Sequence, residues 1–352
     1  MKLLLHIGTE KTGSSYLQSL LANNREQLLE NGIHFPSAGK RENDMIQGKI
    51  SPGNGQELTN SLLAGNKAET GDLLRKHIQE AKNLDCEKVL ISNELLVSAF
   101  SEENQWEMFA DVAEQTGFTD LHLLLFLREP NEQALSLYKH RAKNGTALSI
   151  EEWIREGYHL HHHLTGFFNN IQKYKLKCNI RKHQKDAGYI EGILFNEWLG
   201  LENPQKKVNK TVNPSLSISE LFIIKKIRNY DTELTREFYK RLVAVPIDEK
   251  AKDERIENYY LNVIGDHLAQ HKKLWNHCNS LLPAGEKLTL SGTVPLNKND
   301  RAPEKVVSLS ERQVEVIAEL MADALGPSLR WKLKRQSVRK ELGKLKAKLL
   351  NR

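Results

Sequence analysis

The residues best suited to chemistry form a glycine-rich loop, Gly8–Ser15, near the start of the chain. It combines two glycines with Lys11 and several hydroxyl side chains. An apolar run over residues 2–7 precedes the loop, and a helical pattern beginning near Tyr16 follows it. The N–H groups at the start of a helix lack intrahelical partners and lie at the positive end of the helix dipole. The sequence therefore predicts an anion-binding loop between a strand and a helix, with Lys11 adding a mobile positive charge.

Several further elements must position this loop. We expect strands over residues 2–7, 88–92, 121–127 and 177–182. We expect helices over 13–30, 57–83, 102–116 and 130–144, one around Phe167 and Phe168, and a long loop over 37–56. Alternating strands and helices predict an α/β fold, a parallel β-sheet with helices on both faces. The loops after Ile7, Ile91 and Leu127 should then share the edge where such sheets bind ligands.

The carboxyl-terminal part of the sequence has a different, mainly helical character. Ser217-Ile218-Ser219-Glu220 is a capping-box pattern, and helical stretches follow over 253–281 and 310–325. We therefore expect an α/β domain over residues 1–230 and a helical extension over 231–352.

Composition limits the classes of function. The 352 residues are 39% hydrophobic and 27% charged, as in an ordinary folded protein. The net charge of +6 is uneven, because residues 327–352 hold ten Lys or Arg and a single acid, which leaves the rest mildly acidic. This pattern argues against nucleic acid as a partner.

Cysteine usage and hydropathy suggest a location. Cys86, Cys178 and Cys278 are widely separated and have no metal-ligand spacing, as expected in a reduced compartment. The first apolar run is interrupted at His6 and lacks a signal-peptide core. We expect a cytoplasmic protein. The basic tail, 327–352, is equally compatible with a solvated helix and with an amphipathic helix that contacts a partner or the inner membrane surface.

The loop is not the phosphate-binding loop of nucleoside triphosphatases. That motif, GxxxxGK followed by Ser or Thr, places lysine directly after the second glycine. Here Ser14 occupies that position, and the lysine is Lys11, two residues before Gly13.

The order Lys11-Thr12-Gly13-Ser14-Ser15 resembles the 5′-phosphosulfate loop of bacterial sulfotransferases that use 3′-phosphoadenylyl sulfate (PAPS). A second resemblance lies in Arg128 at the end of a strand and Ser136 eight residues later, with Pro130 opening the helix between them. In that family such residues bind the 3′-phosphate, and guanidinium is suited to forked contacts with phosphate oxygens. A third, weaker resemblance is Asn209–Ser217, which is similar to an Asn-x-Ser-Leu-Ser segment.

The resemblance covers about residues 1–230 and implies a function. It implies transfer of a sulfuryl group from PAPS to a hydroxyl of a carbohydrate or glycolipid, leaving adenosine 3′,5′-bisphosphate (PAP), with no metal required. The implied cofactor-binding residues are Lys11, Thr12, Gly13, Ser14, Ser15, Arg128 and Ser136. The implied catalytic residues are Lys11, which neutralises the leaving oxygen, and Glu94, the general base. The acceptor is expected near residues 37–56 and 145–165.

Other interpretations of these residues stay open. Glu94 could instead cap the turn that follows it. The chain could be a P-loop nucleotide kinase or NTPase, or a non-catalytic nucleotide-binding protein. His159, His161, His162 and His163 invite a metal interpretation, but His159 and His163 have no HExxH pattern or acidic third ligand, so a solvated or acceptor-cleft cluster is favoured and no metal site is expected.

Overall fold

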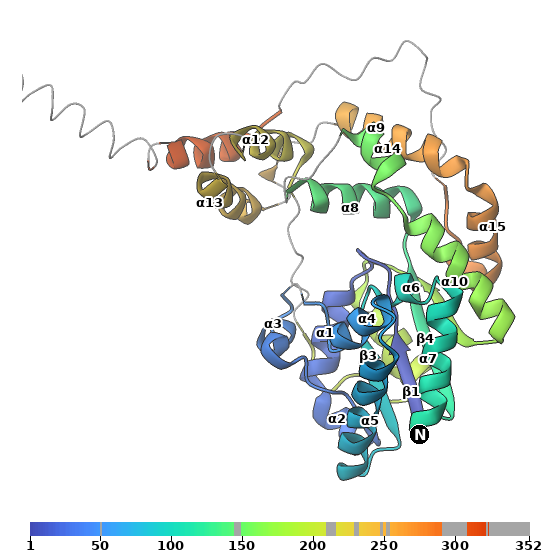
Figure 1. Cartoon of the computed structure of the whole chain (residues 1–352). Helices are drawn as coiled ribbons and strands as arrows, with labels where there is room; N and C mark the ends of the chain where they lie inside the picture. The colour runs from blue at the N-terminus through green and yellow to red at the C-terminus, as the bar shows by residue number, and fades with distance from the viewer. Residues whose placement is uncertain are drawn as a thin grey trace, which may run out of the picture. The chain divides into compact units, whose positions relative to one another are not determined.

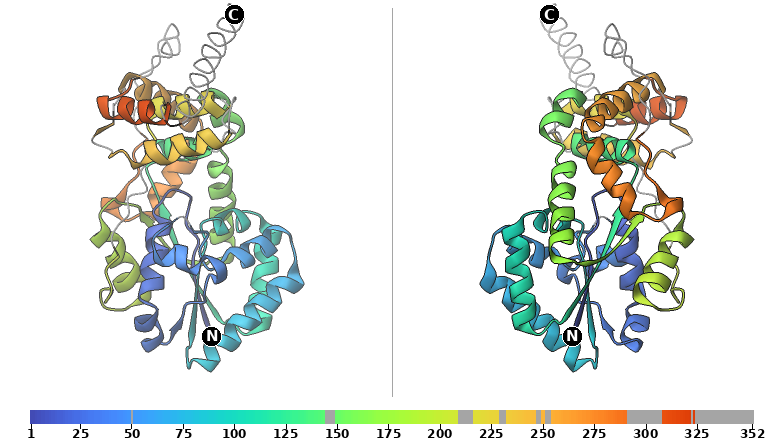
Figure 2. Two further views of the ribbon diagram at one scale, coloured as in Figure 1. Left: turned by 90° about the vertical axis from the view of Figure 1, so that its left-hand side faces the viewer. Right: turned by 90° about the vertical axis from the view of Figure 1, so that its right-hand side faces the viewer.

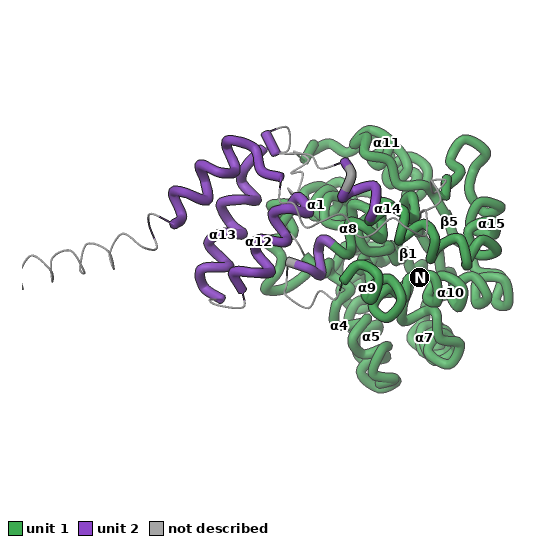
Figure 3. Tube along the Cα trace, turned by 90° about the horizontal axis from the view of Figure 1, so that it is seen from above, with its two compact units in different colours: residues 1–138, 148–213, 260–296 green, residues 139–147, 214–259, 297–352 purple. Residues whose placement is uncertain are grey.

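The computed structural model describes residues 1–49, 51–143, 149–208, 216–228, 232–246, 249–250, 254–290, 308–321 and 323. The chain divides into two compact units, which Figure 3 distinguishes by colour. Unit 1 comprises residues 1–138, 148–213 and 260–296, and unit 2 comprises 139–147, 214–259 and 297–352. This division differs from the expected boundary at residue 230, since residues 260–296 belong to the unit that contains the sheet.

Unit 1 is built on a five-stranded parallel sheet with the strand order β2-β3-β1-β4-β5. Figure 1 labels its strands β1, β3 and β4. The strands are β1 (Lys2–His6), β2 (Ile33–His34), β3 (Lys88–Ser92), β4 (Asp120–Leu127) and β5 (Lys177–Lys182). The four strands expected from the sequence are confirmed. β1, β3 and β4 were recognisable because strands of a parallel sheet that are covered on both faces are nearly continuous apolar runs. β5, at the edge of the sheet, is mostly polar and buries only Ile180.

Helices cover both faces of this sheet (Figure 2). On one face, Leu4, Leu90 and Leu124 join a core cluster with Leu17 and Leu20 of α1 and with the apolar residues of η2. The neighbouring strand residues point to the opposite face, because side chains alternate along a strand. The helices α5, α7 and α10 pack against one another in unit 1. The expected α/β fold with a parallel sheet is therefore confirmed.

The helices of unit 1 have these bounds: α1 (Ser14–Asn23), α2 (Arg25–Glu30), η1 (Gly39–Arg41), α3 (Glu42–Ile46), α4 (Gln56–Leu63), α5 (Lys67–Asn83), α6 (Leu96–Ala99), α7 (Glu103–Thr116), α9 (Ile150–Glu156), α10 (Leu160–Tyr174), α11 (Ala187–Glu191), η2 (Gly192–Leu199), α15 (Lys272–Leu281) and η4 (Ala284–Glu286). The division between the units falls within α8 (Pro130–Lys143) and α14 (Glu254–Ala269).

Three expected helices are wrong in their extent. The helix expected over 13–30 breaks at Asn24, whose side chain binds the backbone of Lys206 through both its amide nitrogen and its oxygen. The helix expected over 57–83 is interrupted between α4 and α5, where Asn66 caps α5 by accepting from the Glu69 N–H at 3.2 Å. The stretch over 253–281 is likewise two helices, α14 and α15.

The segment expected to be a long loop, 37–56, contains η1 and α3. Met45 of α3 is fully buried in the core cluster, and Glu42 accepts a hydrogen bond from Arg25 at 2.6 Å. These anchors come from tertiary contacts, so the short helix carries no periodic apolar signal in the sequence.

Unit 2 contains α12 (Ile218–Arg228), α13 (Thr232–Ala244), the first part of α14 and a helix over 311–321. The expected capping box is confirmed: Glu220 accepts from the Ser217 N–H at 2.7 Å, and Ser217 accepts from the Glu220 N–H at 3.1 Å. The buried Glu220 carboxylate also binds Lys250 at 3.0 Å and Gln313 at 2.7 Å.

Two expected features lie outside the described residues. These are most of the Asn209–Ser217 segment and the basic tail over 327–352. Among the described residues, no helix combines the length and the apolar character needed to cross a membrane.

Candidate functional site

The loop after β1 lies where the chain reverses its direction across the sheet. The connection after β1 runs toward β2 and β3, and the connection after β4 runs toward β5. β1 and β4 are adjacent strands, so the two loops that follow them flank a topological switch point. Ligands of open parallel sheets bind in the crevice at such points. Arg128 follows β4 directly, and its Nη1 donates to the main-chain oxygen of Lys11 at 3.2 Å.

The loop has a conformation that suits anion binding. Gly8, Lys11 and Gly13 have φ angles of 44°, 67° and 80°, all in the left-handed region. Gly13 is the N-cap of α1 and, as a glycine, has no side chain that could cap this ten-residue helix, whose N-terminal end is the kind that binds anions. A left-handed conformation costs a residue such as lysine about 1–2 kcal/mol, so the surroundings must hold Lys11 in place.

Hydrogen bonds from buried side chains hold the loop from both sides. Thr12 donates to the carbonyl oxygen of Thr9 at 2.5 Å, and the Thr9 hydroxyl donates to that of Phe126 at 3.2 Å. Gln133 of α8 donates to the Glu10 carbonyl at 2.9 Å. With the contact from Arg128, these bonds fix the backbone before any ligand arrives, which lowers the ordering cost of binding.

Glu94 lies directly against this loop. A Cβ atom added to Gly8 would lie 3.1 Å from the Cα of Glu94 and 3.2 Å from the Oγ of Ser14. Only glycine therefore lets β1 and the corner after β3 approach this closely. The turn that follows is capped by Asn93, whose side chain accepts from the Leu95 N–H at 2.7 Å. The structure thus brings Glu94, Ser14 and the loop together.

Ser14, which lies beside Gly8 and Glu94, and Gln18, which lies beside Gly53, have buried polar atoms without a partner among the described residues. The two residues lie one turn apart on α1 and are almost completely buried. Ser14 Oγ and both polar atoms of the Gln18 amide lack a hydrogen-bond partner in the described part of the chain. Buried polar groups are rarely left unpaired, because an unmade hydrogen bond costs about 1–3 kcal/mol. These atoms are well suited to contact a polar ligand at this edge.

Arg128 lies just before α8 and Ser136 lies on this helix, eight residues later. The Arg128 Nη2 donates to Glu132 at 2.9 Å, and Ser136, which is partly exposed, lies one helical turn beyond Glu132. Burial would raise the pKa of the Glu132 carboxyl. The hydrogen bond and charge of Arg128, with the charges of Lys185 and His183, outweigh that effect and lower this pKa. Glu132 therefore stays ionised and competes with any phosphate for Arg128.

His183 is a residue of this site that the sequence interpretation missed. It follows β5, and its backbone N–H donates to the carbonyl oxygen of Leu127 at 2.6 Å. Its Nε2 would lie 2.9 Å from a Cβ on Gly13, so the imidazole rests against the loop. His183 could have been found from the sequence. It directly follows the expected strand 177–182, and the residues that follow parallel strands lie at the same edge of the sheet.

A neutral histidine underlies the loop. The His6 side chain is buried at the end of β1, and its Nδ1 lies 2.8 Å from the Ser92 hydroxyl. Burial lowers the pKa of His6 to about 3, so the imidazole is uncharged at neutral pH. His6 therefore adds no positive charge to the site.

Comparisons with protein-family models, with curated proteins and with solved structures gave no match to this chain. The geometry of the site and the motifs in the sequence are therefore the observations that bear on function.

Proposed function

We propose that this chain transfers a sulfuryl group from PAPS to an acceptor hydroxyl, in the carbohydrate or glycolipid class. The observation that carries the proposal is the contact between Arg128 and the main-chain oxygen of Lys11. This contact brings the loop after β1 next to Arg128 at one switch point. A nucleotide with phosphates at both its 3′ and 5′ positions requires two such adjacent groups.

Each phosphate has its own set of groups in this proposal. The N–H groups of Gly13, Ser14 and Ser15 hold the 5′-phosphate at the start of α1, with the Thr12 hydroxyl fixing the loop. The Arg128 guanidinium and the Ser136 hydroxyl hold the 3′-phosphate. Arg128 also pairs with Glu132. The 3′-phosphate must therefore displace the Glu132 carboxylate or share the Arg128 guanidinium with it.

In this proposal, Lys11 and Glu94 carry the reaction step. The acceptor oxygen attacks sulfur in line, the bond between sulfur and the bridging phosphate oxygen breaks, and PAP leaves. Lys11 neutralises the charge that develops on the bridging oxygen. Glu94 takes the proton of the acceptor hydroxyl, and it lies beside Gly8 and Ser14, whose buried Oγ has no partner among the described residues.

The proposal is tested by separating binding from transfer. With PAPS as donor and a panel of carbohydrate and glycolipid hydroxyls as acceptors, the native chain should release PAP in an acceptor-dependent manner. Glu94→Gln should lower turnover by about 100-fold or more, a typical effect of losing a general base, while the affinity for PAP changes little. Full turnover in this variant would remove Glu94 from the role of base.

A non-catalytic binding protein would give a different result. It would bind PAP but release none from PAPS with any acceptor on the panel. A P-loop kinase or NTPase would instead prefer ATP with magnesium over PAP.

A further inference from the structure

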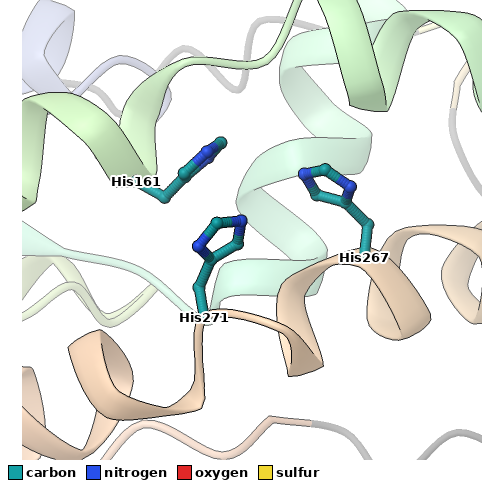
Figure 4. A group of neighbouring side chains, drawn as sticks. All are labelled: His161, His267 and His271. Atoms are coloured by element: carbon teal, nitrogen blue, oxygen red, sulfur yellow. The ribbon is translucent and has the colours of Figure 1, made fainter.

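Three histidines from separate helices converge in unit 1, apart from the loop site. They are His161 in the first turn of α10, His267 near the end of α14 and His271 at the N-cap of α15. One ring nitrogen from each lies within 4.8 Å of the others, and Figure 4 shows the three rings facing one another. The His161 and His271 rings stack with centroids 3.9 Å apart. The pair considered from the sequence, His159 and His163, does not belong to this group.

Two ring nitrogens of this cluster lack a hydrogen-bond partner in the part of the chain that the structure describes. His161 Nδ1 and His267 Nε2 are buried atoms that make no hydrogen bond with any described residue. The side chain of His161 is only 5% exposed, so water does not readily compensate. A bound cation would give both nitrogens a partner and would remove the cost of leaving them unpaired.

A second histidine group in the same unit provides a contrast. His34 and His77 both approach Glu80, with N–O distances of 3.2 and 3.3 Å. The Glu80 carboxylate therefore already provides a hydrogen-bond partner for one nitrogen of each ring. Proximity of the side chains is therefore similar in the two groups, and the difference lies in whether a protein group already occupies the ring nitrogens.

The surroundings of the cluster favour the protonation state of imidazole that binds metals. Burial, and then the neighbouring His271, His162, His267 and His159, lower the pKa of His161 to about 3. Burial and neighbouring histidines also lower the pKa values of His267 and His271. Burial therefore favours the neutral form of these rings, which is the form that binds a metal ion.

We propose that His161, His267 and His271 bind a divalent transition-metal ion, with Zn²⁺ as the best match and a further coordination position open to water. Three neutral imidazoles with an open position are an established donor set for Zn²⁺, which takes nitrogen ligands at about 2.0–2.1 Å. The ion would then fasten α10 to α14 and α15.

A chain of contacts links this site to the nucleotide loop. The Tyr158 ring stacks on His161 with a centroid distance of 5.9 Å, and its hydroxyl donates to Gln133 at 2.9 Å. Gln133 in turn donates to the Glu10 carbonyl oxygen at 2.9 Å. The proposed ion would therefore orient His161 within a network that also supports the loop. Metal binding itself does not depend on the activity proposed for that loop.

The test uses the full chain purified without a histidine tag and stripped with a chelator. Titration with Zn²⁺ in competition with a chromophoric chelator should give one tight site per chain, and Co²⁺ should give visible absorption bands of nitrogen ligation. Zn²⁺ should also raise the unfolding temperature, because it binds the folded state preferentially.

Variants identify the ligands. His267→Ala and His271→Ala should each weaken Zn²⁺ binding by 100-fold or more and abolish the Co²⁺ bands, while the melting temperature in chelator shows that each variant folds. His277→Ala, an exposed histidine on α15, is the matched control and should bind as the native chain does. His77→Gln tests the second group and should also bind normally. Absence of a stoichiometric site, unchanged binding in both ligand variants, or loss in His77→Gln alone would overturn the proposal.

Discussion

The loop edge of the sheet and the histidine cluster both gather nitrogen-bearing side chains in unit 1, but they differ in charge. At the loop edge, a lysine and an arginine lie beside the N-terminus of α1, whose N–H groups add positive potential. In the histidine cluster, burial lowers the pKa of each imidazole and so favours its neutral form. The first arrangement attracts anions and the second offers lone pairs to cations, so protonation state decides which class of ligand each region can hold.

The largest expected effect separates the two regions directly. Arg128→Ala should weaken PAP binding by about 100-fold or more, because truncating a charge-assisted contact costs about 2–5 kcal/mol or more. Zn²⁺ binding should be unchanged in this variant. Calorimetric titration with each ligand measures both quantities.

The matched control for that variant is Arg155→Ala. Arg155 is an exposed arginine on α9 that donates to the carbonyl oxygen of Glu151. Its removal should leave PAP affinity within a factor of two. Equal losses in the two variants would mean that Arg128 acts only through general charge.

A second prediction concerns the steric demand of the loop. Gly13→Ala should destabilise the chain by about 2–3 kcal/mol, because the new Cβ has a left-handed φ and meets the Nε2 of His183 at 2.9 Å. Gly39→Ala has the same conformational cost at φ 58° but no atom within 4 Å, so denaturant unfolding should show a smaller loss. Removing the His183 side chain should partly rescue Gly13→Ala and not Gly39→Ala. Identical losses would show that the imidazole does not press on the loop.

The pH dependence of the free energy of unfolding should reveal the buried, neutral imidazole of His6. The pKa of His6 is about 3 in the folded chain and about 6.5 when unfolded, so the unfolded state binds the proton first as the pH falls. The associated stability is complete above pH 6.5 and decreases toward pH 3, by at most about 1.4 kcal/mol per pH unit. His6→Gln should flatten this part of the unfolding profile measured with denaturant. A profile with the same slope in the variant would assign the effect to other groups.

The smallest expected effect is a gain. Glu132→Gln removes the carboxylate that competes for Arg128, so PAP should bind a few-fold more tightly, in line with the roughly 0.2–1 kcal/mol of an exposed ion pair. Glu69→Gln, an exposed change on α5, provides a control that should leave affinity unaltered. Weaker binding in Glu132→Gln would mean that this carboxylate orients Arg128 and does not compete.

The loop edge could be predicted from the sequence, because its motifs consist of neighbouring residues and the geometry of a parallel sheet brings the motifs together. Residues 88–92 form the expected strand, and Arg128 and Lys11 meet because parallel strands end at one edge. The histidine cluster was not accessible in this way. His161 meets His267 and His271 only through the packing of helices that are distant in the chain, which no local spacing encodes. Asn24 is a similar case, because tertiary hydrogen bonds to Lys206 accompany the break between α1 and α2.

The central claim is that the loop edge binds a nucleotide with phosphates at both ends. The most direct measurement is a pair of calorimetric titrations of the full chain, one with PAP and one with ATP and magnesium. We predict tight one-to-one binding of PAP, strongly weakened in Arg128→Ala, and much weaker binding of ATP. Preference for ATP with magnesium, or PAP binding that is insensitive to Arg128→Ala, would contradict the account.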